Sequence, residues 1–279
     1  ELSRELEGGA LSLDDAAALV SELECESLQS RANHLVRLLA PMAPEQNLAA
    51  VRALAGDGES IDDFAARWSR PLFHVVLTAH PTFLLTPAQT EAVAQAASSG
   101  DVSQATVCIV DPERPAITLA SEHDAAMAAL ARAQDARDAI NRTLLSEAAA
   151  RWPGGWRGLR PMPFQFASWV GYDMDGRTDI GWATSIHFRL MEKARRLARY
   201  RDAMADIDPA HPVAAQLARA ADHARAMEAL FAADLSAPDA MSDAANRLTA
   251  DHADAILSLN PLIAALEDDA SVAPEERAR

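Results

Sequence analysis

A histidine and two aspartates follow short apolar runs in this sequence. His80 comes after the run at residues 72–77, and Asp173 and Asp175 come after the run at residues 164–170. An imidazole can transfer a proton near neutral pH, and carboxylates can bind backbone N–H groups or a cation. Because side chains at strand ends are held by a rigid scaffold, these three residues are candidates for a ligand site.

Two longer motifs contain these residues. One reads T-A-H-P-T over residues 78–82, and the other reads F-A-S-W-V-G-Y-D-M-D-G-R-T over residues 166–178. Together they resemble the phosphoenolpyruvate carboxylase family, in which T-A-H-P-T follows the first barrel strand and a later signature is close to F-T-S-W-M-G-G-D-R-D-G-N-P. The approach to the second motif, through residues 156–158 and 161–163, is also similar. The likeness covers most of this chain and the first part of a family member.

The resemblance implies that this chain is the N-terminal part of a phosphoenolpyruvate carboxylase-like protein. Such a protein, when complete, joins bicarbonate to phosphoenolpyruvate and gives oxaloacetate and phosphate, a carbon dioxide-fixing lyase reaction that supplies the tricarboxylic acid cycle. It uses Mg²⁺ to stabilise the enolate. The metal ligands lie further along family sequences, so no metal ligand is assigned to this chain. The resemblance further implies a cytoplasmic location and a homo-oligomer at full length.

The resemblance also assigns roles to residues of this chain. His80 is the implied catalytic residue, which takes a proton from, or hydrogen-bonds to, a carboxyphosphate-like intermediate. The implied substrate-binding or site-shaping residues are Thr78, Thr82, Asp173, Asp175 and Arg177.

The chain departs from the family pattern at positions that bind anions. Family members usually carry two arginines shortly after T-A-H-P-T, but residues 83–85 here are Phe-Leu-Leu and the next arginine is Arg114. Met174 stands where the family has an arginine, and Arg177 where it has an asparagine. These losses leave a second interpretation open, a carboxylase-like binding or regulatory module without catalysis. The 279-residue chain alone is expected to be inactive.

The acidic segment at residues 173–176 can form a structural turn or ligate a metal ion. It does not fit a calcium-binding loop, because Gly171 and Trp182 would occupy the first and last ligand positions. It does not fit an aspartyl phosphatase motif either, since Arg177 stands where threonine is needed. We expect a turn that buries one aspartate against backbone N–H groups or caps the next helix, and direct metal ligation is the alternative.

Arginines and tryptophans near the second motif have simpler explanations than ligand binding. A basic cluster is predicted to pair with acidic neighbours on a solvated helix face, and consists of Arg195, Arg196, Arg199 and Arg201. A group of tryptophans is predicted to form local core, and consists of Trp152, Trp156, Trp169 and Trp182.

Composition limits the class of protein. The formal net charge is −16, from 25 basic and 41 acidic residues, which disfavours nucleic acids and anionic membranes as partners but still permits a small anion in a local arginine pocket. No apolar run is long enough to span a bilayer. Cys25 and Cys108 lack metal or redox spacing, as expected for a reduced, cytoplasmic chain.

Hydrophobic periodicity predicts a mainly helical α/β chain with few strands. Strands are predicted at residues 72–77, 106–110, 116–120 and 164–170, the first of them buried. Helices are predicted at residues 12–41, 60–70, 86–97, 125–151, 180–205, 213–233 and 241–259, and from residue 261. Residues 1–71 are expected to form an N-terminal helical region, and residues 72–279 a partial barrel region.

So few strands cannot close a (β/α)8 (TIM) barrel, which needs eight. The chain is therefore either an α+β domain with a small sheet or the first part of a larger barrel. The family resemblance favours the second.

Overall fold

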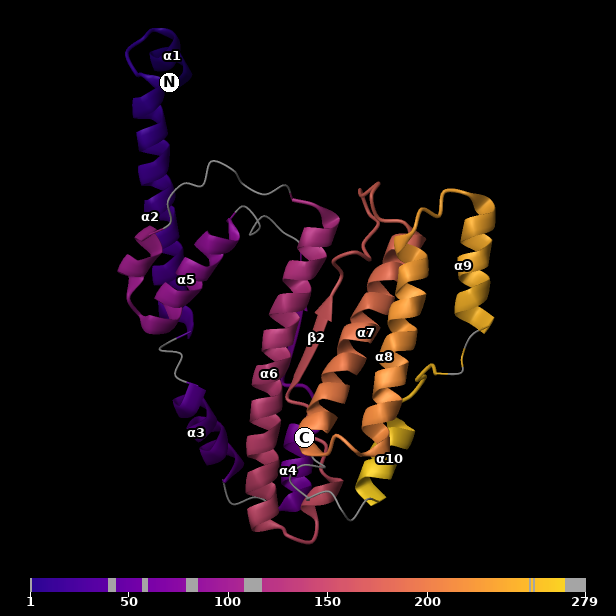
Figure 1. The fold of residues 1–279 in the computed structure, drawn as a ribbon. Helices are drawn as coiled ribbons and strands as arrows, with labels where there is room; N and C mark the ends of the chain where they lie inside the picture. The colour runs from indigo at the N-terminus through magenta and orange to yellow at the C-terminus, as the bar shows by residue number, and fades with distance from the viewer. Residues whose placement is uncertain are drawn as a thin grey trace. The chain divides into compact units, whose positions relative to one another are not determined.

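The computed structural model of this chain describes residues 2–39, 44–56, 60–78, 85–107, 117–250, 252 and 254–268. Most of them are helical, as predicted (Figure 1). None of the helices in these ranges combines the length and hydropathy that a membrane span requires. The chain divides into two compact units, one from residues 1–50 and 79–117 and the other from residues 51–78 and 118–279. The expected division at residue 72 stays a prediction.

The first unit is a small helical cluster. Its elements are α1 (Leu2–Glu7), α2 (Leu13–Leu39), α5 (Pro87–Ser99) and a 3₁₀ helix, η2 (Val102–Val107). Helix α5 begins after Thr86, as predicted, where Thr86 and Gln89 form a capping box, and it ends at Ser99 with Gly100 as its left-handed C-cap. Its core includes Leu28 of α2 and Val93 of α5.

The second unit contains the remaining helices. They are α3 (Pro44–Ala55), whose second half belongs here, α4 (Ile61–Trp68), α6 (Leu119–Arg151), the 3₁₀ helix η3 (Trp156–Gly158), α7 (Trp182–Ile207), α8 (Pro212–Ala232), α9 (Pro238–Ala250) and α10 (Asn260–Asp268). Helices α7 and α8 pack through small residues such as Ala194 and Ala221. A separate core joins α4, α6 and η3 around Phe64 and Leu144.

A two-stranded parallel sheet pairs the strand before the first motif with the strand that begins the second. Strand β1 (Phe73–Leu77) pairs with β2 (Phe164–Ser168) from Phe73 opposite Phe164 to Leu77 opposite Ser168. Both strands were predicted, and their parallel pairing brings their carboxyl ends level. Helix α6 packs against β2 (Figure 1).

The prediction that β1 is buried is wrong for the described residues. Phe73 is 62% exposed and Val76 is 45% exposed. Apart from His74 the strand is apolar, and such a run is typical of parallel strands covered on both sides. Within the described ranges, however, the sheet has only two strands, so β1 has a single neighbour and its side chains reach solvent.

Three further predictions need correction. Residues 106 and 107 lie in η2, and residues 119 and 120 lie in the first turn of α6, so neither segment is a strand where it is described. Helix α6 starts six residues before its predicted first residue, 125, because Thr118 and Ser121 form a capping box. Helix α9 ends at Ala250 rather than near residue 259. Helix α3 was not predicted.

Candidate functional site

The carboxyl edge of the sheet carries the first residue of the T-A-H-P-T motif and part of the second motif. Thr78 directly follows β1 and Trp169 directly follows β2, and the paired residues Leu77 and Ser168 precede them. The sheet thus places Thr78 close to Trp169, shortly before the acidic turn (residues 173–176). This carboxyl edge is where the sites of barrel proteins lie. His80 and Thr82 lie outside the described residues, so their implied roles stay predictions.

The acidic turn is a tight backbone structure. The N–H groups of Tyr172 and Asp173 both donate to the Trp169 carbonyl, at 2.9 and 3.2 Å. The Oδ1 atom of Asp173 accepts from the Asp175 N–H at 3.2 Å. Asp173 therefore binds a backbone N–H group, as expected for a turn, but the expectation that it is buried is wrong, because both aspartates are exposed. Among the described residues, no three histidine, cysteine or acidic side chains converge as a metal site.

Arg177 ties the far end of the turn to α6. Its guanidinium donates to both carboxylate oxygens of Asp179, each at 2.7 Å, and to Glu122 at 3.2 Å. The bidentate bond to Asp179, with the bond to Glu122, raises the pKa of Arg177, and the same pairing lowers the pKa of Asp179. Arg177 is thus engaged by two carboxylates, so an anionic ligand would have to compete with them.

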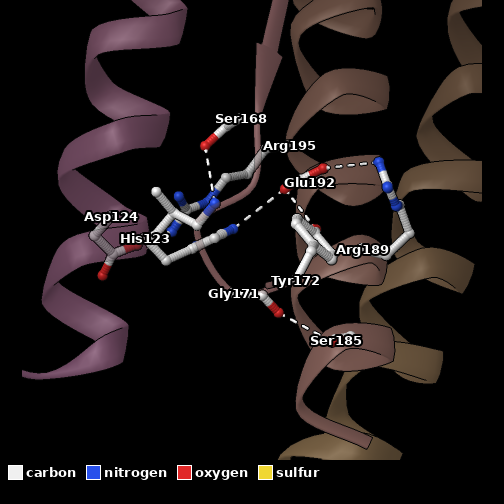
Figure 2. A network of polar contacts seen from close by, with 10 residues as sticks. His123, Asp124, Ser168, Gly171, Tyr172, Ser185, Arg189, Glu192 and Arg195 are labelled. Carbon is white, nitrogen blue, oxygen red and sulfur yellow. Dashed lines mark hydrogen bonds and ion pairs between the residues drawn. The ribbon is translucent and has the colours of Figure 1, made fainter. Parts of the chain in front are cut away.

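A polar network holds the near end of the turn (Figure 2). The Tyr172 hydroxyl donates to Glu192 Oε1 at 2.6 Å, and His123 Nε2 lies 3.3 Å from the same oxygen. Arg189 contacts Glu192 Oε2 at 3.4 Å, and its guanidinium lies 4.7 Å from the centre of the Tyr172 ring. His123 is fully buried and stacks on Phe188, with 4.0 Å between ring centroids.

The backbone of the turn also contacts α7. The Ser185 hydroxyl donates to the Gly171 carbonyl at 3.0 Å (Figure 2). Gly171 has φ of 88°, and a Cβ atom there would lie 2.4 Å from Phe188 Cδ2. Ser185, Phe188 and Glu192 recur at helical spacing, so one face of α7 carries all these contacts.

Electrostatics fix the roles of donor and acceptor in this network. Burial raises the pKa of Tyr172, and its bond to Glu192 raises it further, so the hydroxyl keeps its proton. Burial also raises the pKa of Glu192, but the bonds from His123 and Tyr172 and the charge of Arg189 outweigh burial, and the net pKa is lowered. At neutral pH Glu192 is therefore a carboxylate that accepts from a tyrosine hydroxyl.

Three of the four arginines in the basic cluster on α7 are paired with aspartates, as predicted: Arg195, Arg199 and Arg201. Arg195 binds Asp124 at 2.8 Å, and Arg199 binds Asp135 and Asp138 at 2.6 and 2.7 Å. Arg195 and Arg199 also line an open hollow on α7 and α8. Because these aspartates already neutralise them, the hollow is a weak candidate for binding an anion.

The tryptophans divide into two kinds. Trp156 is buried, and Trp152 packs edge-on against Phe64 at 5.4 Å. Trp169 and Trp182 are largely exposed, so the prediction of local core holds only for the first two.

Sequence reasoning missed the residues that hold the turn. It singled out neither Tyr172 nor Glu192, and it left Glu122 and His123 outside the helix predicted from residue 125. The helical spacing on α7 is the one sequence signal that could have grouped its contact residues.

Comparisons with known proteins identified no relative of this chain. A scan against protein-family models found no match, and searches of curated proteins and of solved structures found no similar sequence or fold. The family interpretation therefore depends on the two motifs and on the geometry described above.

Proposed function

We propose that this chain is the N-terminal part of a phosphoenolpyruvate carboxylase-like protein that, when complete, makes oxaloacetate and phosphate from phosphoenolpyruvate and bicarbonate. The observation that carries the proposal is the level, parallel pairing of β1 with β2. Thr78, which begins T-A-H-P-T, and Trp169 of the second motif therefore lie at the same edge of the sheet. Active sites of α/β barrels lie at this carboxyl edge.

Exposure of β1 supports a barrel that extends beyond these strands. Parallel sheets are normally covered on both faces, yet Phe73, Val75 and Val76 are exposed. Further strands and helices of a longer protein would cover them. The proposed protein is a cytoplasmic homo-oligomer with phosphoenolpyruvate and bicarbonate as its small-molecule substrates.

The proposed chemistry divides between this chain and the rest of the protein. His80 handles the carboxyphosphate-like intermediate by proton transfer or hydrogen bonding. Asp173, Asp175 and Arg177 shape the edge of the site, and Thr78 and Thr82 are the other proposed substrate-binding or site-shaping residues. Mg²⁺ would stabilise the enolate from ligands in the remainder of the protein, where the family resemblance puts them.

The alternative, a non-catalytic carboxylase-like binding or regulatory module, has one specific observation in its favour. Arg177 is the only arginine of the second motif, and Asp179 and Glu122 already bind it. Residues 83–85 supply no arginine either. A phosphate-bearing substrate would then depend on cations from elsewhere in the protein.

A coupled malate dehydrogenase assay with phosphoenolpyruvate, bicarbonate and Mg²⁺ tests the proposal. We expect no turnover from the 279-residue chain alone, and turnover from the longer gene product. His80→Asn in the longer protein should lower the rate by about 10²–10⁴-fold, the usual contribution of proton transfer. His34→Asn, at an exposed position of α2, is the matched control and should leave the rate unchanged. Failure of the longer protein to make oxaloacetate would favour the non-catalytic module.

A further inference from the structure

Two consecutive residues of α6 reach the two ends of the acidic turn. Glu122 binds Arg177 at 3.2 Å, just after the turn. His123 lies 3.3 Å from Glu192 Oε1, which also accepts from Tyr172, just before Asp173.

The α6 side chains that make these contacts are buried. His123 has no exposed surface and Glu122 is 8% exposed, whereas the side chain of Glu192 is 21% exposed. Asp173 and Asp175, which lie between Tyr172 and Arg177 in the sequence, are exposed. Two buried side chains of α6 therefore hold the ends of a segment whose own carboxylates face outward.

The chemistry of His123 sets the direction of one contact. The carboxylate of Glu192 can only accept a hydrogen, so in the neutral form of the ring the hydrogen is on Nε2. Nδ1 is buried and has no partner among the described residues. If Nδ1 carries no hydrogen, no buried N–H donor is left without an acceptor at this position.

We propose that Glu122, His123 and Glu192 are positioning residues that fix the acidic turn at the carboxyl end of β2. Glu122 acts through Arg177, and His123 acts through Glu192 and Tyr172; these five residues form the turn clamp. The role of the clamp in ligand binding rests on the proposed function, because it takes the turn as part of the site. The mechanical role of the clamp does not.

Hydrogen exchange measured by mass spectrometry on the whole chain tests the clamp directly. Tyr172→Phe keeps the ring and removes only the donor to Glu192. We expect exchange of the peptide covering residues 169–178 to become about tenfold faster, since a hydrogen bond to a charged group is lost. Glu192→Ala should have at least the same effect. Glu192→Gln should restore slow exchange, because the amide keeps an acceptor oxygen for Tyr172.

Controls separate local loosening from general unfolding. Exchange in α8 should be the same in every variant. Asp222→Asn removes an exposed ion pair with Arg225 on α8 and should leave the turn unchanged. Unchanged turn exchange in both Tyr172→Phe and Glu192→Ala, or equal acceleration in the turn and α8, would overturn the proposal.

The tautomer of His123 gives a readout that a purely space-filling ring would not. Nitrogen NMR of the wild-type chain, at a pH where the ring is neutral, should show the hydrogen on Nε2. A hydrogen on Nδ1 would overturn the proposed contact with Glu192, even if every variant fails to fold.

The clamp and the proposed function can fail separately. If the longer protein makes no oxaloacetate but Tyr172→Phe still loosens the turn, the clamp stands and the carboxylase proposal fails. If the longer protein is active but neither Tyr172→Phe nor Glu192→Ala loosens its turn, the clamp fails alone.

Discussion

A side chain on Gly171 would collide with the ring of Phe188. A Cβ atom at residue 171 would lie 2.4 Å from Phe188 Cδ2, closer than real Cβ contacts. Gly171 also has φ of 88°, in the left-handed region that disfavours other residues. Both constraints fall on the residue that directly precedes Tyr172, so glycine at this position sets how closely the turn approaches α7.

Gly171→Ala should therefore destabilise the protein by about 2–4 kcal/mol, from the strained backbone and from overpacking against Phe188. Urea denaturation would measure the change in unfolding free energy. Gly176→Ala is the control, because residue 176 has φ of 70° but open space around its Cα. It should cost only about 1–2 kcal/mol, from backbone strain alone. Equal losses in the two variants would contradict close packing at Gly171.

Glu192 should make part of the stability depend on pH. Its folded pKa is lowered although burial opposes this, because His123, Tyr172 and Arg189 all favour the carboxylate. A lowered folded pKa stabilises the protein above the unfolded value, about 4.3 for glutamate, and this contribution is lost as pH falls through the folded pKa.

The measurement is the difference in unfolding free energy between wild type and Glu192→Gln from pH 7 to pH 3. The difference should be constant above about pH 5 and should shrink below about pH 4.3. A difference that stays constant, or that grows on acidification, would show that the carboxylate is not favoured by its neighbours.

Arg177→Ala should destabilise the protein more than Asp179→Ala. Both lose the exposed pair between these two residues, but only the arginine variant leaves Glu122 buried without its cation. Thermal unfolding of the two variants and of Glu122→Gln/Arg177→Ala would show the order. The double variant should recover part of the loss, because it removes the buried charge. An equal loss in both single variants would mean that the bond to Glu122 adds nothing.

A sugar phosphate activator should bind weakly or not at all in the region after T-A-H-P-T. Charge-assisted arginine contacts dominate phosphate binding, and residues 83–85 are Phe-Leu-Leu. Calorimetric titration of the longer protein with a sugar phosphate is the test. Micromolar binding that is lost on substitution within residues 83–85 would contradict this expectation.

Local signals in the sequence predicted local structure well. The helix starts predicted near residues 60 and 86 are confirmed, and the structure shows a capping box at each, Ser60 with Asp63 and Thr86 with Gln89. The apolar run at residues 116–120 was misassigned because short apolar runs fit a strand or a helix, and the Thr118 capping box decides for the helix from residue 119.

Features set by distant partners could not be predicted in the same way. His123 and Glu192 are 69 residues apart, and nothing near either residue indicates their contact. The exposure of β1 is also nonlocal, because the burial of a strand depends on which elements cover it. The sequence placed both motifs at strand ends, but it did not predict that these two strands pair with each other.

The sheet also has a consequence for the order of folding. Its two strands are about ninety residues apart, so their pairing must close a long loop before any ladder bond forms. The α7–α8 hairpin, joined by a short connection, closes a far smaller loop. Helical hairpins should therefore form early and the β1–β2 pair late. During that interval the apolar strands are unpaired, which is when the chain is most prone to aggregate.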